Sequence, residues 1–431
     1  MKKALVLAGG GTRGSYQNGV VHALRRLGKD DWNMVCGTSI GALNAALVVQ
    51  HDYKPMDEMW HNLKQEQIIN GVIPIDMDLN EMINDRADIS SFVKKFLKDK
   101  GADISPLISY IERLYNPERF FESDIDFGCV CAKHRTKEPV FVDKEMMKEH
   151  GLDWLIATAS AYPAFPVHEI DGQEYIDGGY FDNLPIDLAL QKGADEIIAV
   201  DLNSEPQHPN FMDRPNITYI FPRTETGSFL VFDKATVMRL ETCGYYDTMK
   251  TYHVFDGVKY TFEKADLPSW WHDFYLEILK LETRIKLASS INDRFRSTQV
   301  ITDWLLLKER ARIMDDKAMY YGFMDSLMDL AGCDVQKIWT YREARSAILL
   351  AFADCVREDY QYYPPLLKPT QLLGYFRTLD AKGIISKILY ANLYPEHMAL
   401  SENMRLTINP IENAQALFVT YLMKDLQDTG I

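Results

Sequence analysis

The 431-residue sequence has no apolar run long enough to cross a membrane as a helix. A spanning helix needs about 18 or more consecutive apolar residues, and a signal peptide needs an apolar core of at least about seven. The first apolar run, residues 4–8, is shorter than either and ends at Gly9-Gly10-Gly11. We therefore expect neither a signal peptide nor a transmembrane segment, and we interpret residues 4–8 as a buried strand.

Cysteine is also scarce, and its spacing indicates neither a disulfide framework nor a zinc site. The closest pair, Cys129 and Cys131, has the separation of alternate residues on a strand, whose side chains point to opposite faces. We expect the cysteines to be reduced and mostly buried, which is typical of a cytoplasmic protein. The six positions are Cys36, Cys129, Cys131, Cys243, Cys333 and Cys355.

Positive charge is in deficit, with 47 Lys and Arg against 62 Asp and Glu and a net charge of −15. This balance argues against a nucleic-acid partner and against docking of the whole surface on an anionic membrane. A local patch is still compatible with peripheral membrane contact. Composition is otherwise ordinary for a globular protein and leaves the oligomeric state open.

What the sequence does contain is a repeated order of strand, turn and helix. An apolar run at 4–8, a glycine-rich turn and a helix at 15–27 are followed by a second run at 34–36, a serine turn and an apolar helix. This order predicts an α/β fold: a doubly wound, mostly parallel sheet with helices on both faces. Further strands are expected at 125–132, 139–142, 196–200 and 217–221, a hairpin at Asp171-Gly172, helices at 56–67, 89–97, 152–160 and 184–191, and an acidic surface loop at 76–88.

Strand signals stop near residue 265. Helical periodicity continues at 270–291, 300–328, 338–357 and 410–425, with charged residues on the opposite faces. We therefore predict an α/β domain over residues 1–258, followed by an all-helical domain over 266–431 whose role the sequence does not indicate.

The serine turn is Gly37-Thr38-Ser39-Ile40-Gly41. A serine on a strained turn between a strand and a helix is exposed to substrate above the helix N-terminus. The two flanking glycines suit backbones that come too close for side chains. The helix dipole favours the negative charge that develops when a serine attacks a carbonyl. Ser39 is therefore a candidate nucleophile.

The first turn, Gly9-Gly10-Gly11-Thr12-Arg13-Gly14, allows two interpretations. It fits a dinucleotide-binding fingerprint, and Asp30-Asp31 lie about 20 residues further on. In a dinucleotide-binding fold the acidic residue that binds the ribose stands at the end of the second strand, but this sequence has the serine turn there. This placement argues against the dinucleotide interpretation. The other interpretation is an oxyanion hole formed by the amides of Gly10 and Gly11. Arg13 would then steady the loop or meet an anionic substrate group.

A serine nucleophile needs a base. None of the later histidines, at positions 208, 253, 272 and 397, lies in a turn at the end of an apolar strand. Asp177 does end a predicted strand and precedes Gly178-Gly179. A carboxylate in a partly dry cleft could act as the base directly, with its pKa raised by desolvation. The same residues are also compatible with a simple Asp-Gly turn that ends a hairpin.

Together the three motifs resemble the patatin-like phospholipase family of lipid acyl hydrolases, which use a Ser–Asp dyad. The resemblance covers residues 1 to about 255, and Ala8 stands where many members have an aspartate. It implies a nucleophile at Ser39, a base at Asp177, and no metal or cofactor. It further implies an oxyanion hole from Gly9, Gly10, Gly11, Arg13 and Gly14, a nucleophile elbow from Gly37, Thr38, Ile40 and Gly41, and a base motif completed by Gly178 and Gly179.

The sequence thus predicts a serine acyl hydrolase acting on fatty acyl esters of phospholipids or lysophospholipids. An alternative is a membrane-recruited scaffold whose hydrolase site is vestigial. In that case the aromatic-rich helical half would be the working surface, with Trp270, Trp271, Trp304 and Trp339.

Overall fold

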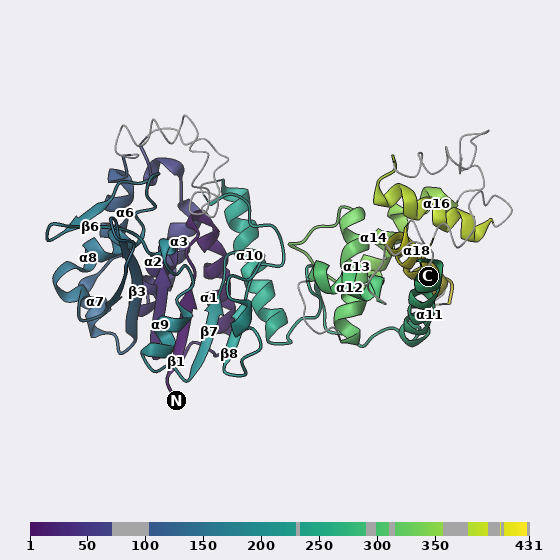
Figure 1. The fold of residues 1–431 in the computed structure, drawn as a ribbon, viewed down its shortest axis with the longest axis horizontal. Coiled ribbons are helices and arrows are strands. Elements are labelled where there is room, and N and C mark those ends of the chain that lie inside the picture. Colours follow the sequence, from purple (N-terminus) through teal and green to yellow (C-terminus); the bar gives the residue numbers. More distant parts are fainter. Residues whose placement is uncertain are drawn as a thin grey trace. The chain divides into compact units, whose positions relative to one another are not determined.

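The structure is a computed structural model that divides into two compact units, Met1–Tyr252 and His253–Ile431 (Figure 1). Each unit is described by itself. That the second unit has a separate role remains a prediction. The residues that the structure describes are 1–70, 103–229, 233–289, 299–309, 315–356, 378–394, 406 and 409–428.

An eight-stranded sheet forms the centre of the first unit, in the order β5-β6-β3-β2-β1-β7-β8, with β4 paired to β3. Strands β3, β2, β1, β7 and β8 run parallel to one another, whereas β4 and β6 pair antiparallel with β3, and β5 pairs antiparallel with β6. The predicted mostly parallel sheet is confirmed. The strands are β1 (Lys3–Leu7), β2 (Met34–Thr38), β3 (Asp126–Lys133), β4 (Pro139–Asp143), β5 (His168–Ile170), β6 (Gln173–Asp177), β7 (Glu196–Val200) and β8 (Ile217–Ile220).

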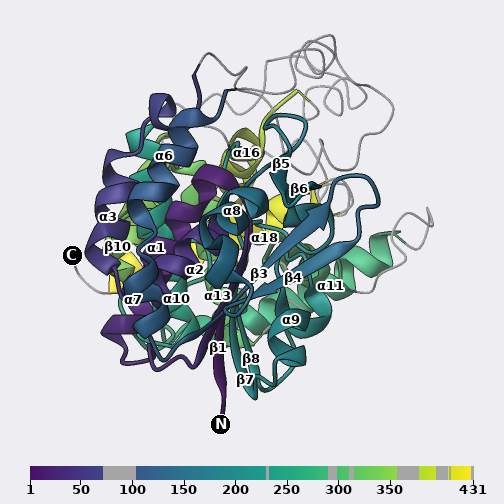
Figure 2. The same cartoon turned by 90° about the vertical axis from the view of Figure 1, so that its left-hand side faces the viewer.

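Helices cover both faces of this sheet, as predicted. Figure 2 shows α1, α2, α3 and α10 gathered on one side of β1, with α9 on the other. Right-handed crossovers explain why the helices divide between the two faces. The connections from β1 to β2 and from β2 to β3 advance toward one edge of the sheet, whereas the connection from β6 to β7 runs toward the other edge and so places its helix on the opposite face. The helices are α1 (Ser15–Arg26), α2 (Ile40–Val49), α3 (Tyr53–Asn62), α6 (Ser105–Leu114), α7 (Pro117–Glu122), α8 (Met147–Thr158), α9 (Ile186–Gln191) and α10 (Lys234–Thr251).

Most differences from the predicted elements lie at helix ends. The helix expected at 56–67 ends at Asn62 and is followed by a separate 3-10 turn, Gln65–Gln67. The helix expected at 184–191 begins only at Ile186, directly after Pro185, and the one expected from 152 already begins at Met147. The helix predicted at 89–97 and the loop at 76–88 lie outside the described residues.

The second unit is mainly helical, with two departures from prediction. The helix expected over 300–328 is interrupted at Asp315, whose side chain accepts the Ala318 N–H and caps a new helix. Strand β10 (Ile338–Trp339) stands where a helix was expected and pairs in parallel with β9 (Thr261–Phe262). Helix α14 (Tyr341–Ala351) starts only at Tyr341, because Thr340 and Glu343 form a capping box there. The other helices are α11 (Trp271–Ser289), α12 (Val300–Glu309), α13 (Asp316–Leu330), α16 (Ala381–Leu393) and α18 (Pro410–Asp428).

The four tryptophans of the second unit do not form an exposed surface. Trp271 and Trp339 are buried in its hydrophobic core, and Trp270 and Trp304 are partly buried against it. Their stacking partners are core rings such as Phe274. The tryptophans therefore serve packing, which removes the feature that favoured a scaffold role.

Within the described ranges, no helix is both long enough and apolar enough to cross a bilayer. The five cysteines that can be described, at positions 36, 129, 131, 243 and 333, are all unpaired. Four of these five are buried, as predicted.

Candidate active site

Ser39 occupies a strained turn between β2 and α2, with φ 55° and ψ −128°. Its flanking glycines are needed for packing. A Cβ on Gly37 would lie 2.4 Å from the backbone of Gly41, and one on Gly41 would lie 2.3 Å from the Leu7 carbonyl oxygen. The Ser39 amide donates to Thr158 Oγ1 at 3.0 Å, which fixes the turn against helix α8. This geometry is that of a nucleophile elbow.

The sheet register brings Asp177 to the same place. Thr38, at the end of β2, pairs with Val130 on β3, and the next β3 residue, Cys131, pairs with Asp177 on β6. Ser39 and Asp177 therefore lie on either side of β3 at the same level of the sheet. The two positions predicted from separate motifs are brought together.

The Asp177 carboxyl is buried, with 2% of the residue exposed. Desolvation raises its pKa to about 6, and this rise is limited by the Ser39 hydroxyl and by the Gly179 amide. Oδ1 accepts the Gly179 N–H at 2.7 Å, whereas Oδ2 is buried without an aligned donor among the described residues. The Ser39 hydroxyl is thus near enough to influence the carboxyl but is not aligned for a regular hydrogen bond. Such a carboxylate can accept a proton near neutral pH.

The glycine-rich loop lies against Ser39. A Cβ on Gly9 would come within 3.1 Å of Ser39 Cβ, so the loop could not approach as closely with a larger residue. Asn183 holds Gly9 by two hydrogen bonds. The Gly9 amide donates to the Asn183 backbone carbonyl at 2.9 Å, and Asn183 Nδ2 donates to the Gly9 carbonyl at 3.0 Å. None of the described residues accepts a hydrogen bond from the amides of Gly10 and Gly11. Of these two residues, Gly11 lines the cavity beside Ser39, and Gly10 is buried next to it in the chain.

Arg13 stabilises the loop and does not line the cavity beside Ser39. Its side chain is buried, Nε donates to the Gly227 carbonyl at 2.8 Å, and one terminal nitrogen donates to Asn203 Oδ1 at 3.1 Å. Gly14 packs close to Ile40, where a Cβ would lie 2.6 Å from the side chain. Of the two roles expected for Arg13, these contacts favour steadying the loop.

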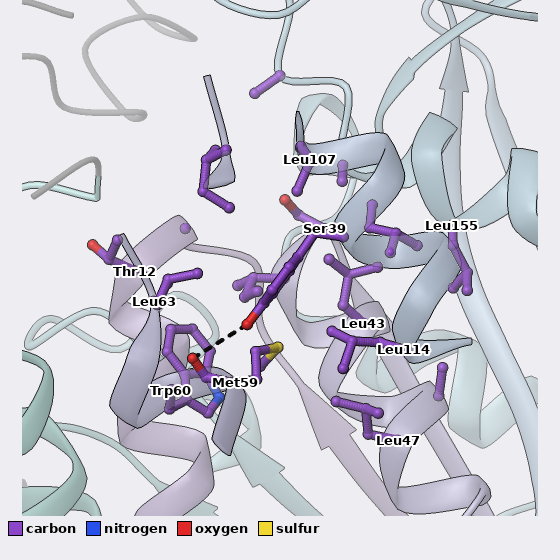
Figure 3. Close-up of a pocket in the computed structure, with 18 of the residues that line it drawn as sticks. Thr12, Ser39, Leu43, Leu47, Met59, Trp60, Leu63, Leu107, Leu114 and Leu155 are labelled. Carbon is purple, nitrogen blue, oxygen red and sulfur yellow. Dashed lines mark hydrogen bonds between the residues drawn. The ribbon is translucent and has the colours of Figure 1, made fainter. Parts of the chain in front are cut away.

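An apolar cavity of about 90 Å³ begins at Ser39. Figure 3 shows Ser39 among the lining side chains, with Leu43 and Leu47 at successive turns of α2 below it. The dashed line in Figure 3 joins the Tyr110 hydroxyl to the Met59 carbonyl at 3.5 Å. The remaining lining is mostly aliphatic or aromatic and comes from α2, α3, α6, α8, the glycine loop and connecting segments: Gly11, Thr12, Ile40, Ala46, Trp60, Leu63, Ile68, Leu107, Ile111, Leu114, Tyr115, Leu155, Ala159, Ala161, Phe165 and Phe229.

No histidine is among the residues that line this cavity in the described part of the chain. His208 instead faces Asp182, with Nε2 3.4 Å from Oδ1, and this carboxylate raises the pKa of the imidazole. The position of His208, beside Asp182 and outside the cavity lining, agrees with the expectation that it is not at the reacting centre.

Two supporting residues were missing from the predicted site. Thr158 Oγ1 accepts a hydrogen bond from the Ser39 amide and donates one to the Val130 carbonyl at 2.6 Å. These two bonds connect the turn at Ser39 to β3. Asn183 orients Gly9 and in turn donates to Gln207 at 3.0 Å. In the sequence their only signal is a polar residue beside small or apolar ones, which does not distinguish them from ordinary surface residues.

A serine on a strained turn, a buried carboxylate beside it and two backbone amides without an acceptor among the described residues form the arrangement that a serine hydrolase on an α/β fold would need. Residues 5–190 match the model of the family described as patatin-like phospholipase. This match agrees with the family resemblance that the sequence motifs predicted.

Two relatives show the extent of the similarity. Patatin-like phospholipase domain-containing protein 7 of Rattus norvegicus is 27% identical over 213 residues, which cover 47% of this chain and 14% of the relative. Lysophospholipase NTE1 of Scheffersomyces stipitis is 29% identical over 203 residues, covering 46% and 12%. The chain therefore spans only a small part of the length of these relatives.

Among solved structures, VipD from Legionella pneumophila aligns over 97% of this chain and 92% of its own, with 14% sequence identity and a TM-score of 0.38.

Proposed function

We propose that the protein is a serine acyl hydrolase that cleaves fatty acyl esters of phospholipids or lysophospholipids. The observation that carries this proposal is the position of Ser39, which lies beside the buried Asp177 carboxyl and at the mouth of an apolar cavity. The family whose model residues 5–190 match supports lipid esters as substrates. The name of the yeast relative, a lysophospholipase, agrees with this substrate class.

In the proposed mechanism, Ser39 Oγ attacks the acyl carbonyl carbon while its proton moves to Asp177, whose Oδ2 has no competing donor in the described part of the chain. The oxyanion that forms is stabilised by the amides of Gly10 and Gly11 and by the N-terminus of α2. Collapse of the tetrahedral intermediate breaks the ester C–O bond, and the departing alcohol takes the proton from Asp177.

The second half of the cycle uses the same groups. Asp177 removes a proton from a water molecule, whose oxygen attacks the acyl-Ser39 carbonyl. Collapse of the second tetrahedral intermediate returns the proton to Ser39 Oγ and releases the fatty acid. None of these steps requires a metal or a cofactor.

The cavity indicates where the acyl chain lies. Apart from its tyrosine, threonine and serine hydroxyls, its walls offer mostly hydrocarbon and aromatic surface, which favours an alkyl chain over a polar group. The polar leaving group would then remain on the solvent side of Ser39. We further propose a cytoplasmic location, supported by the unpaired cysteines, and peripheral contact with the membrane that supplies the lipid.

A labelling and turnover experiment tests the proposal. A fluorophosphonate probe should label the wild-type protein at Ser39, and Ser39→Ala and Asp177→Asn should each abolish most hydrolysis of a p-nitrophenyl acyl ester and of a lysophospholipid. His208→Gln is the matched control and should keep its activity, because His208 does not line the cavity. Full activity in Ser39→Ala would reject the assignment. Absence of both labelling and turnover in the wild type would favour the scaffold alternative.

A further inference from the structure

A group of histidine and carboxylate side chains lies outside the acyl hydrolase site, where helices α1, α3 and α10 pack together (Figure 2). His22 comes from α1, Asp57 from α3 and Glu241 from α10, and one ligand atom of each lies within 4.8 Å of the others. His61, one turn after Asp57 on α3, also faces this group, with Nε2 2.8 Å from Glu241 Oε2. Three side chains that could bind a metal therefore converge from three helices, and His61 lies beside Glu241.

The group is held in place by the packing of its helices. Gly19 on α1 touches the backbone of α10 next to the site, because a Cβ there would lie 1.9 Å from the Glu241 carbonyl oxygen. The Asn18 side chain donates to Asp57 Oδ1 at 3.0 Å, an outer contact of the kind that orients metal-binding carboxylates. These contacts fix α1 against α10 and orient the Asp57 carboxylate.

The two carboxylates of the group pair with histidine side chains. The ion-pair partners of Asp57 and Glu241 are imidazoles, and within the described residues no lysine or arginine pairs with either carboxylate. Their side chains are 29% and 16% exposed, so an ion from solvent can reach them. Two carboxylates and two imidazoles this close favour a divalent cation.

We propose that His22, Asp57 and Glu241 bind a structural Zn²⁺ ion, with His61 as the fourth ligand. Mixed imidazole and carboxylate ligands suit zinc, whereas magnesium and calcium prefer oxygen ligands alone. Tetrahedral zinc with bonds of about 2.0–2.2 Å places its ligand atoms about 3.4 Å apart. In the structure His22 Nε2 lies 2.5 Å from Asp57 Oδ1, so zinc binding would separate these atoms by side-chain rotation. His61 Nε2 would turn from Glu241 toward the ion.

The ion would join α3 to α1 and α10. Met59 and Trp60, which lie between Asp57 and His61 on α3, line the apolar cavity at Ser39. Zinc would therefore stabilise one wall of the cavity without taking part in bond cleavage. Because the site does not involve Ser39, this inference is independent of the proposed function.

The test uses the full chain after removal of metal with a chelator. Titration with zinc chloride, followed by calorimetry, should give one ion per chain, and zinc should raise the melting temperature. Cobalt(II) in the same site should give the visible absorption of a tetrahedral complex. His22→Gln and Glu241→Gln should each bind zinc at least ~10-fold more weakly and lose the cobalt spectrum. His168→Gln is the control, since its imidazole pairs with Asp153 at 2.9 Å elsewhere in the chain, and it should bind zinc as the wild type does.

Melting of the metal-free variants shows whether each one folds, and Asp57→Asn replaces any variant that does not. Ser39→Ala should bind zinc normally, which separates this result from the outcome for the hydrolase. The proposal is overturned if the wild type shows no saturable zinc binding, or if His22→Gln and Glu241→Gln bind zinc as tightly as the control.

Discussion

Asp177 reaches Ser39 across a single intervening strand. Strand β3 pairs in parallel with β2, which carries Ser39 at its end, and antiparallel with β6, which ends at Asp177. The carboxyl is buried between these elements, and its pKa is raised to about 6 by desolvation. The proposed reaction and the stability of the fold therefore depend on the same buried group.

The first prediction concerns the pH dependence of hydrolysis. Asp177 must be ionised to take the Ser39 proton, so kcat/KM for a soluble ester should fall about tenfold per pH unit below about pH 6. Above that value it should level off. A pH profile with a substrate that does not titrate measures this directly. A rate that stays constant down to pH 4 would contradict a base with a raised pKa.

The second prediction is that Asp177→Asn stabilises the fold at high pH. Burial raises the pKa of this carboxyl from its ordinary value of 3.8 to about 6, so the folded state binds the proton more tightly than the unfolded state. The acid form therefore favours folding, and this contribution is lost as the pH rises through about 4 to 6. Above pH 6, ionisation of the buried Asp177 carboxyl lowers the free energy of unfolding by about 3 kcal/mol. The uncharged asparagine of Asp177→Asn avoids this loss.

Urea unfolding at pH 8 and pH 5 measures this effect. The gain in the free energy of unfolding should approach ~3 kcal/mol at pH 8 and should be about half as large at pH 5. Ser39→Ala, which keeps the carboxyl, is the control and should show no such pH-dependent gain. A loss of stability at pH 8, or a gain of equal size at both pH values, would argue against an ionised, desolvated Asp177.

The third prediction concerns Gly9. A Cβ there would lie 2.4 Å from Asn183 Oδ1 and 3.1 Å from Ser39 Cβ, so Gly9→Ala must displace the loop from Ser39. Since the loop carries the proposed oxyanion donors, kcat should fall ~10²–10³-fold. Gly28→Ala is the control, because Gly28 has φ 63° but open space around its Cα. It should lose stability, by about 1–2 kcal/mol, and keep its kcat.

Much of this site could be predicted from local sequence. Continuous apolar runs marked the buried parallel strands, and glycines at fixed offsets marked the turns at Ser39 and Asp177, because close backbone approach excludes side chains there. The register through β3 could not be predicted, since it depends on pairing between strands far apart in the chain. The same is true of Asn183 and of the cavity wall from α6.

The zinc ligands were missed for a similar reason. His22 and Glu241 are far apart in sequence, and only the helix packing at Gly19 brings them together. A search for cysteine pairs at zinc spacing has no means of finding such a site. The tryptophans of the second unit show the opposite error, because aromatic content was interpreted as an exposed surface although these side chains pack in and against a core.

The last prediction is that helix α2 sets the length of the acyl chain. With a rise of 1.5 Å per residue, Leu43 lies about 6 Å and Leu47 about 12 Å from Ser39 along the helix axis. Both side chains line the cavity (Figure 3), so a bulky residue at either position shortens the space available to an alkyl chain. Leu47→Trp should lower kcat/KM for a dodecanoyl ester and leave a butyryl ester nearly unchanged.

Two further variants make the order of positions testable. Leu43→Trp, closer to Ser39, should exclude shorter chains than Leu47→Trp does, whereas Leu47→Ala should shift the preference toward longer chains. A series of p-nitrophenyl esters of increasing chain length gives the comparison, with melting temperatures to account for overpacking that costs about 1–3 kcal/mol. If Leu47→Trp lowers kcat/KM equally for every chain length, the acyl chain does not run along α2, because a shortened cavity affects only chains long enough to reach its end.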